Sequence, residues 1–145
     1  MKYFGCILDF TDTRNKELMR AFKLAYEADG ALTIDELAER IVNTPCSRFW
    51  VSSERAMVVV SDLIKGKPAL DGMRPTKRDM FQEIFNRVGA LKEQRPKLPL
   101  REAVSFVVHT PAPKFYMLPR SAMEIIYKIK KGFYEKQYRY NKANS

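Results

Sequence analysis

Three segments of this 145-residue chain place basic side chains directly beside aromatic rings. Two are short and alike, Arg48-Phe49-Trp50 and Lys114-Phe115-Tyr116, and the third, residues 128–142, holds six basic residues and one acidic residue. Lys and Arg can neutralise phosphate groups while aromatic rings stack on bases, a combination found in proteins that bind single-stranded nucleic acid. The pattern therefore indicates nucleic-acid binding. Its candidate contacts are Arg48, Trp50, Lys114, Tyr116, Lys128, Lys130, Lys131, Lys136, Tyr138 and Arg139.

The same aromatic residues also have a structural interpretation. Phe49 and Phe115 can close the bottom of each three-helix core, one in each copy, while Trp50 and Tyr116 pack beside them with part of each ring exposed. In the C-terminal segment, Phe133 can continue the apolar stripe of a helix, and the lysines then serve solubility. The two interpretations are compatible, and the sequence leaves both open.

Charge is distributed unevenly along the chain. The whole sequence carries +9, but residues 1–66 hold nine Lys/Arg against ten Asp/Glu, whereas residues 67–145 hold 17 against seven. A field of one sign attracts polyanions and speeds their encounter with the protein. We therefore expect a nucleic acid, DNA rather than RNA, as the partner of the second half, with a protein partner for the near-neutral first half as a further expectation.

Residues suited to catalysis or metal binding are sparse. The single histidine, His109, falls at the expected end of a helix, where a polar side chain is ordinary. Cys6 and Cys46 are too few for a zinc site. Phosphate-cradling glycine loops, the Gly-x-Ser-x-Gly elbow and His-Glu-x-x-His are all lacking from the sequence. We therefore expect a protein that is not an enzyme and that needs neither a cofactor nor a metal.

The sequence also repeats itself. Residues 34–66 align without a gap on residues 100–132 at a constant shift of 66, and nine of the 33 pairs are identical. The identical pairs include the turn signals Thr44-Pro45 and Thr110-Pro111, and the alignment continues upstream with a shift of 63. A match of this kind is typical of an internal duplication.

Each copy has the apolar spacing of three helices, with the i, i+3, i+4, i+7 pattern of one buried face. The middle helix of the first copy begins at a capping box, Thr33-x-x-Glu36. Ser52 is the expected N-cap of the third helix, and Pro119 lies in the first turn of its counterpart. The expected buried positions are Leu18, Ala21, Phe22, Ala25, Ile34, Leu37, Ala38, Ile41, Val42, Ala56, Val59, Val60 and Leu63 in the first copy, and Phe81, Ile84, Phe85, Val88, Leu91, Leu100, Ala103, Val104, Val107, Val108, Ala122, Ile125, Ile126 and Ile129 in the second.

The middle helix TIDELAERIV, followed by a third helix that opens with Ser-Ser-Glu-Arg, resembles the helix-turn-helix class of DNA-binding domains over residues 33–65 and, by duplication, over residues 99–131. The connecting segment differs from that class, because it has about eight residues with proline and aromatics, where three or four are usual. The resemblance implies that the third helix reads DNA, which adds Arg55 and Arg120 to the candidate contacts. The early exposed positions that it implies are Ser53, Glu54, Arg55 and Val58 in the first copy and Arg120, Ser121 and Glu124 in the second.

Together these patterns predict an all-α fold of two tandem three-helix, helix-turn-helix-like repeats that pack together, residues 1–66 and residues 67–145, with the basic aromatic tail on the second. The chain has no run of 18 apolar residues, and its N-terminal segment is too short for a signal peptide, so we expect a cytoplasmic protein without a membrane partner. The favoured function is a non-enzymatic, regulatory or accessory DNA-binding protein. The alternative is a protein-interaction or assembly module, in which Trp50 and Met57 would be contact residues.

Overall fold

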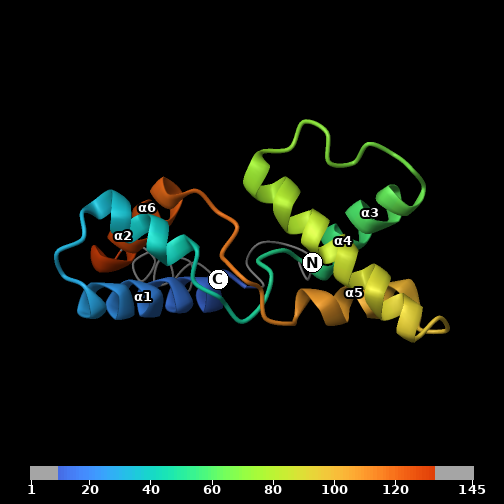
Figure 1. Ribbon diagram of the computed structural model, residues 1–145, viewed down its shortest axis with the longest axis horizontal. Helices are drawn as coiled ribbons and strands as arrows, with labels where there is room; N and C mark the ends of the chain where they lie inside the picture. The colour runs from blue at the N-terminus through green and yellow to red at the C-terminus, as the bar shows by residue number, and fades with distance from the viewer. Residues whose placement is uncertain (1–9, 133–145) are drawn as a thin grey trace, which may run out of the picture. The chain divides into compact units, whose positions relative to one another are not determined.

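The computed structural model describes residues 10–132, and this part of the chain is all-helical (Figure 1). It contains no β-strand, only an isolated antiparallel bridge between Cys46 and Ala112. The predicted all-α fold is therefore confirmed. The helices are α1 (Thr11–Ala28), α2 (Ile34–Val42), α3 (Ser53–Ile64), α4 (Pro75–Gln94), α5 (Leu100–Val108) and α6 (Pro119–Lys130).

The helices begin at the capping residues and prolines that the sequence predicts. Ahead of α2, the Glu36 amide donates to the Thr33 hydroxyl and the Thr33 amide donates to the Glu36 carboxylate, which confirms the capping box. Ser52 precedes α3 in an extended conformation and its side chain accepts the Arg55 amide, as expected of an N-cap. Proline begins both α4 and α6, where its missing N–H costs no helical hydrogen bond.

The helices form two compact units. One unit holds α3, α4 and α5, from residues up to Asp12 and from Asn43–Tyr116, and the other is built from Thr13–Val42 with the segment that starts at Met117, which supply α1, α2 and α6. Within the units, α3 packs against α4 and α5, and α6 packs against α2. This division differs from the expected one at residue 66, because each half of the sequence contributes its third helix to the unit of the other half.

The core of the α3–α4–α5 unit is built from large side chains. Phe49, Phe81 and Phe115 are almost fully buried there, and they come from the segment before α3, from α4 and from the segment after α5. Branched aliphatic residues complete the core, so that the unit packs large rings against stiff side chains. These residues are Val59, Val60, Ile84, Val88, Val104, Val107 and Val108.

The core of the α1–α2–α6 unit uses smaller side chains. Leu18, Ile41 and Ile126 are fully buried, and alanines fill much of the remaining space. The buried alanines are Ala21, Ala25, Ala38 and Ala122.

The expected buried faces are confirmed for most positions in both units. Ile34 is an exception, 57% exposed, because it is the first residue of α2 and lies outside the stripe that begins at Leu37. Side chains at the edges of the stripes, such as Phe22 and Leu63, are half-buried.

Candidate functional site

The connecting segments before α3 and after α5 run side by side within the α3–α4–α5 unit. Cys46 and Ala112 exchange both backbone hydrogen bonds at 3.0 Å, and the Phe49 amide donates to the Val108 carbonyl. The Cys46 thiol lies 3.3 Å from the Arg48 carbonyl and 3.4 Å from the Lys114 carbonyl. The two basic-aromatic motifs are therefore held together by main-chain contacts.

The rings of these motifs pair crosswise. Phe49 stacks with Tyr116 at a centroid distance of 5.9 Å, and Trp50 stacks with Phe115 at 6.0 Å. Phe49 and Phe115 are buried core residues, while Trp50 and Tyr116 are half-buried. The burial of Phe49 and Phe115 and the partial exposure of Trp50 and Tyr116 are therefore confirmed, but both phenylalanines lie in the core of the α3–α4–α5 unit and not in one core each. A nucleic-acid contact by Trp50 or Tyr116 would have to use the exposed part of a ring that is already packed.

Tyr116 combines burial with an unusual backbone. Burial of its phenol raises the pKa above the ordinary tyrosine value, and the negative charge of Glu83 adds to this effect. Its φ of 55° is the only positive value among non-glycine residues in the described part of the chain, a conformation that costs a bulky side chain about 1 kcal/mol. The Lys114 ammonium lies 5.4 Å from the Tyr116 ring centroid. Both residues therefore contribute to the local packing.

Arg48 fastens the segment in front of α3. Its guanidinium donates to the Phe49 carbonyl at 2.9 Å and to the Val51 carbonyl at 2.7 Å, and it lies 5.2 Å from the Phe10 ring centroid. Arg48 therefore has a structural role, and its contact with nucleic acid stays a prediction. Arg55, on the first turn of α3, is exposed and lies 5.9 Å from the Phe81 ring centroid.

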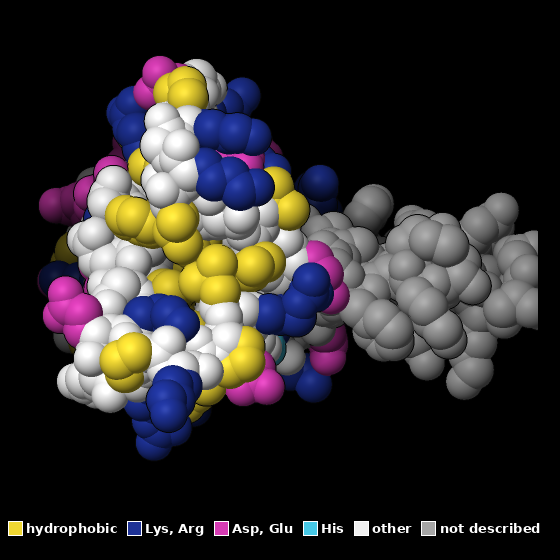
Figure 2. Space-filling model, turned by 90° about the vertical axis from the view of Figure 1, so that its right-hand side faces the viewer, with side chains coloured by type: hydrophobic (Ala, Val, Ile, Leu, Met, Phe, Trp, Pro, Cys, Tyr) yellow, Lys and Arg dark blue, Asp and Glu magenta, His cyan; other side chains and the backbone are white. Residues whose placement is uncertain are grey.

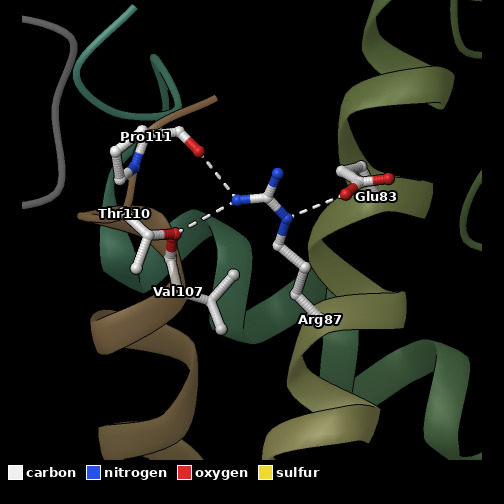
Figure 3. Close-up of polar contacts among 5 residues, drawn as sticks. All are labelled: Glu83, Arg87, Val107, Thr110 and Pro111. Carbon is white, nitrogen blue, oxygen red and sulfur yellow. Dashed lines mark hydrogen bonds and ion pairs between the residues drawn. The ribbon is translucent and has the colours of Figure 1, made fainter. Parts of the chain in front are cut away.

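Arg87 on α4 is a functional-looking residue that the sequence did not single out. Its guanidinium donates to the Pro111 carbonyl at 2.8 Å, to the Thr110 hydroxyl at 3.3 Å and to the Glu83 carboxylate at 2.8 Å (Figure 3). The Thr110 hydroxyl in turn donates to the Val107 carbonyl. Arg87 also lies 5.0 Å from the Phe49 ring centroid, so it ties α4 to the segment after α5 rather than facing a ligand. Glu83 is its i,i+4 neighbour, but Thr110 and Pro111 are 23 and 24 residues away, and no local pattern could have found these contacts.

The exposed face of α6 holds the densest set of described candidate contacts. Arg120, Lys128 and Lys131 are exposed and lie at helical spacing on one side, with Tyr127, 42% exposed, between them. Glu124 is the one acidic residue in this stripe. The opposite side of α6 is buried through Ala122, Met123 and Ile126. The helix therefore presents a basic face with an accessible ring.

Lys130 belongs to the edge of α6 rather than to this face. Its ammonium lies 4.1 Å from the Phe22 ring centroid on α1, a cation–π contact within the α1–α2–α6 unit. Beside it, a surface hollow of about 460 Å³ is lined by basic residues of α1 and by Ile129 of α6. The basic residues of this hollow are Lys16, Arg20 and Lys23, and Glu27 is its acidic member. The candidates Lys136, Tyr138 and Arg139 lie outside the described residues.

The exchange of helices evens out the charge. Among the described residues, 10–12 and 43–116 hold 13 Lys/Arg against eight Asp/Glu, and 13–42 and 117–132 hold nine against seven. Both units are thus basic, unlike the two halves of the sequence. Figure 2, which looks onto the side where α3, α4 and α5 lie in Figure 1, shows Lys and Arg side chains scattered among acidic and apolar ones.

Comparison with protein-family models, with curated proteins and with solved structures gives no match to this chain. Within residues 10–132, no helix has the length and the hydropathy needed to cross a membrane.

Proposed function

We propose that this chain binds nucleic acid, with duplex DNA as the first ligand to test, through the exposed face of α6. The observation that carries the proposal is the stripe of Arg120, Lys128 and Lys131 with Tyr127 among them. Guanidinium and ammonium groups at helical spacing can neutralise successive backbone phosphates, and an exposed ring can pack on a sugar or a base.

The pairs of helices that resemble a helix-turn-helix differ from those expected from the sequence. Because α6 packs against α2, and α3 against α5, the pairs that could act as support helix and reading helix are α2 with α6 and α5 with α3. Within the second pair, the exposed start of α3 carries Glu54 beside Arg55. We therefore favour α6 as the reading helix, with Arg120 at its start.

We also infer that the two halves arose by duplication, with the third helices exchanged. The supporting observation is the pairing of equivalent positions: Cys46 bonds to Ala112, which is 66 residues later, and the stacked pairs Phe49–Tyr116 and Trp50–Phe115 are related by the same shift. Such pairing is expected around a local two-fold axis.

The test is fluorescence anisotropy of labelled duplex and single-stranded DNA at about 50 and 200 mM salt. A triple variant R120Q/K128Q/K131Q should weaken binding about tenfold or more and should lower the salt slope by about two to three, because each lost phosphate contact removes roughly one unit. The matched control is R74Q/K77Q/R78Q at the start of α4, where three exposed basic residues are lost from the other unit. This control should change the affinity by less than about threefold.

Two results would reject the proposal: binding that does not weaken with salt, or equal weakening by the two triple variants.

The second candidate function, a protein-interaction module, is favoured by exposed apolar residues of the α3–α4–α5 unit. Phe106 is 61% exposed and Val58 is 51% exposed, while the earlier candidates Trp50 and Met57 are half-buried. F106S should then abolish capture of a protein partner and leave DNA binding unchanged.

A further inference from the structure

A cavity of about 460 Å³ lies within the α3–α4–α5 unit, and the nucleic-acid proposal does not use it. One wall is a single face of α5, where Arg101, Ser105 and His109 follow one another at intervals of four residues. The facing wall comes from the segment before α3 and from its first turns. The residues of this wall are Arg48, Ser52, Ser53, Glu54 and Met57. The volume is within the range of small-molecule sites.

The positive charge of Arg48 is held in a fixed position at this cavity. Its guanidinium donates to the Phe49 and Val51 carbonyls and lies 3.3 Å from the His109 Nε2 atom. Since a guanidinium can only donate, Nε2 accepts, and the proton of His109 resides on Nδ1, which donates to the Ser105 carbonyl at 2.8 Å. The His109 ring is thus oriented from both sides, by the Arg48 guanidinium and by the Ser105 carbonyl.

Arg101 supplies a second guanidinium from the other end of the α5 face. It is exposed and has no hydrogen-bond or ion-pair partner within the described part of the chain. Between the two arginines, the Ser53 and Ser105 hydroxyls lie 3.4 Å apart and can turn toward a ligand, whereas the Ser52 hydroxyl already accepts the Arg55 amide. The cavity therefore offers the guanidinium fork of Arg101, the positive charge of Arg48 and two hydroxyl donors, with Glu54 as its one carboxylate.

We propose that this cavity binds a phosphate group. The guanidinium fork of Arg101 matches phosphate oxygens in bidentate geometry, the serine hydroxyls can donate to the remaining oxygens, and the charge of Arg48 attracts the anion. Two arginines against one glutamate leave a net positive charge, and a phosphate dianion gains more from it than a monoanionic carboxylate does. The cavity is larger than one phosphate group, so the phosphate can belong to a small molecule or to a nucleic-acid backbone.

The equivalent face in the other unit has the opposite character. At a shift of 66 residues, Arg101 and Ser105 of α5 correspond to Asp35 and Glu39 of α2. Two carboxylates there would repel a phosphate. The proposed site is therefore particular to the α3–α4–α5 unit, and it stands or falls independently of the α6 proposal.

The experiment is a titration of ¹⁵N-labelled protein with inorganic phosphate, followed by amide chemical shifts, with chloride adjusted to constant ionic strength. Resonances of Ser53, Ser105 and His109 should shift saturably. R101Q should raise the dissociation constant about tenfold or more, the usual effect of losing a charged hydrogen bond. The matched control R78Q removes the same charge from an exposed site on α4. It should change the dissociation constant for phosphate by less than about twofold. E54Q should tighten binding.

Equal effects of R101Q and R78Q, or shifts that do not involve the cavity, would overturn the proposal, since both would indicate attraction by overall charge. The source of the phosphate follows from two further titrations, with ribose 5-phosphate and with a short oligothymidylate. Tighter binding of ribose 5-phosphate than of inorganic phosphate, without competition by the oligonucleotide, would assign the site to a small molecule. Displacement of phosphate by the oligonucleotide, lost in R101Q, would assign it to a nucleic-acid backbone.

Discussion

The two three-helix units bury corresponding positions with side chains of different size. In α4 the buried face holds Phe81, Ile84 and Val88, whereas the corresponding positions of α1, at a shift of 63, hold Leu18, Ala21 and Ala25. Buried area scales with side-chain size, and each additional buried methylene contributes about 0.8 kcal/mol. The comparison therefore indicates that one helical plan supports a large-residue core in the α3–α4–α5 unit and a small-residue core in the α1–α2–α6 unit.

The outer faces of the two units carry their cationic residues on different helices. The α5 face carries Arg101 where α2 carries Asp35, and the start of α3 carries Glu54 where α6 carries Arg120. Cationic groups thus lie on the middle helix of one unit and on the third helix of the other. If the two halves are copies, the same framework has come to direct positive charge to two different surfaces, which is why we propose separate anion-binding roles for them.

The largest effect is expected from truncation of the larger core. F81A should destabilise the protein by about 4 kcal/mol, because it removes a buried ring and leaves a cavity, and L18A at the corresponding position of α1 should cost about 3 kcal/mol. Urea unfolding followed by circular dichroism measures both. Native-state hydrogen exchange should report the loss of protection in α5 for F81A and in α2 for L18A. A cost for L18A equal to or above that for F81A would break the comparison of the two cores.

A smaller effect is expected from Arg87, which ties α4 to the segment after α5. R87M keeps the aliphatic stem but removes the hydrogen bonds to Pro111 and Thr110, and it should cost about 1–2 kcal/mol in thermal or urea unfolding. The ion pair with Glu83 is about one-third exposed, so E83Q should cost less than about 0.5 kcal/mol.

The corresponding residue of α1 is Leu24, 56% exposed, which makes L24M a control for the position itself. L24M should change the free energy of unfolding by less than about 0.5 kcal/mol. An R87M cost no larger than the L24M cost would mean that the carbonyl contacts of Arg87 contribute nothing measurable.

Local chemistry allowed much of this fold to be predicted from the sequence. The helix faces, the Ser52 cap and the capping box at Thr33 all depend on residues close together in the chain. Each is fixed by helical period or by short-range hydrogen bonds. Hence the all-α class and most of the core positions could be predicted.

The pairing of the helices could not be predicted in the same way. An apolar stripe specifies which face of a helix is buried but not which helix covers it, and α3 and α6 have nearly the same stripe. A connecting segment of about eight residues can span up to roughly 28 Å, enough to reach either set of partners. The cavity role proposed for Arg101 depends on that pairing, because α3 supplies the facing wall, so the sequence alone did not single it out.

The helix starts of the two units sharpen the comparison further. Thr33 and Glu36 cap α2 reciprocally, whereas α5 begins after Pro99, which provides no side-chain cap. T33A should cost about 1 kcal/mol, the usual effect of losing an N-cap side chain, and should reduce amide protection in the first turn of α2. The control P99A removes no capping hydrogen bond and should leave protection in the first turn of α5 unchanged. Equal losses in the two helices would contradict the assigned difference.

The smallest effect concerns the pH dependence of this cap. The Glu36 carboxylate accepts the Thr33 amide, and its hydrogen bonds to Thr33 hold the pKa of Glu36 below the ordinary glutamate value. A group whose pKa is lower in the folded state stabilises that state above its unfolded pKa, and this contribution is lost as the pH falls through the folded value. Stability of the first turn of α2 should therefore decline slightly from about pH 5 downward.

Carbon-detected NMR of the Glu36 carboxyl, together with amide exchange in α2, would follow this titration. E36Q should remove the pH dependence of the first turn, because the amide oxygen still accepts the Thr33 N–H but does not titrate in this range. The matched control is E102Q, since Pro99 has neither an N–H nor a hydroxyl with which to complete a capping box on α5. A Glu36 carboxyl that titrates at the ordinary value would show that the reciprocal hydrogen bonds do not persist in solution. The starts of α2 and α5 would then differ only in the proline, Pro99, that precedes α5.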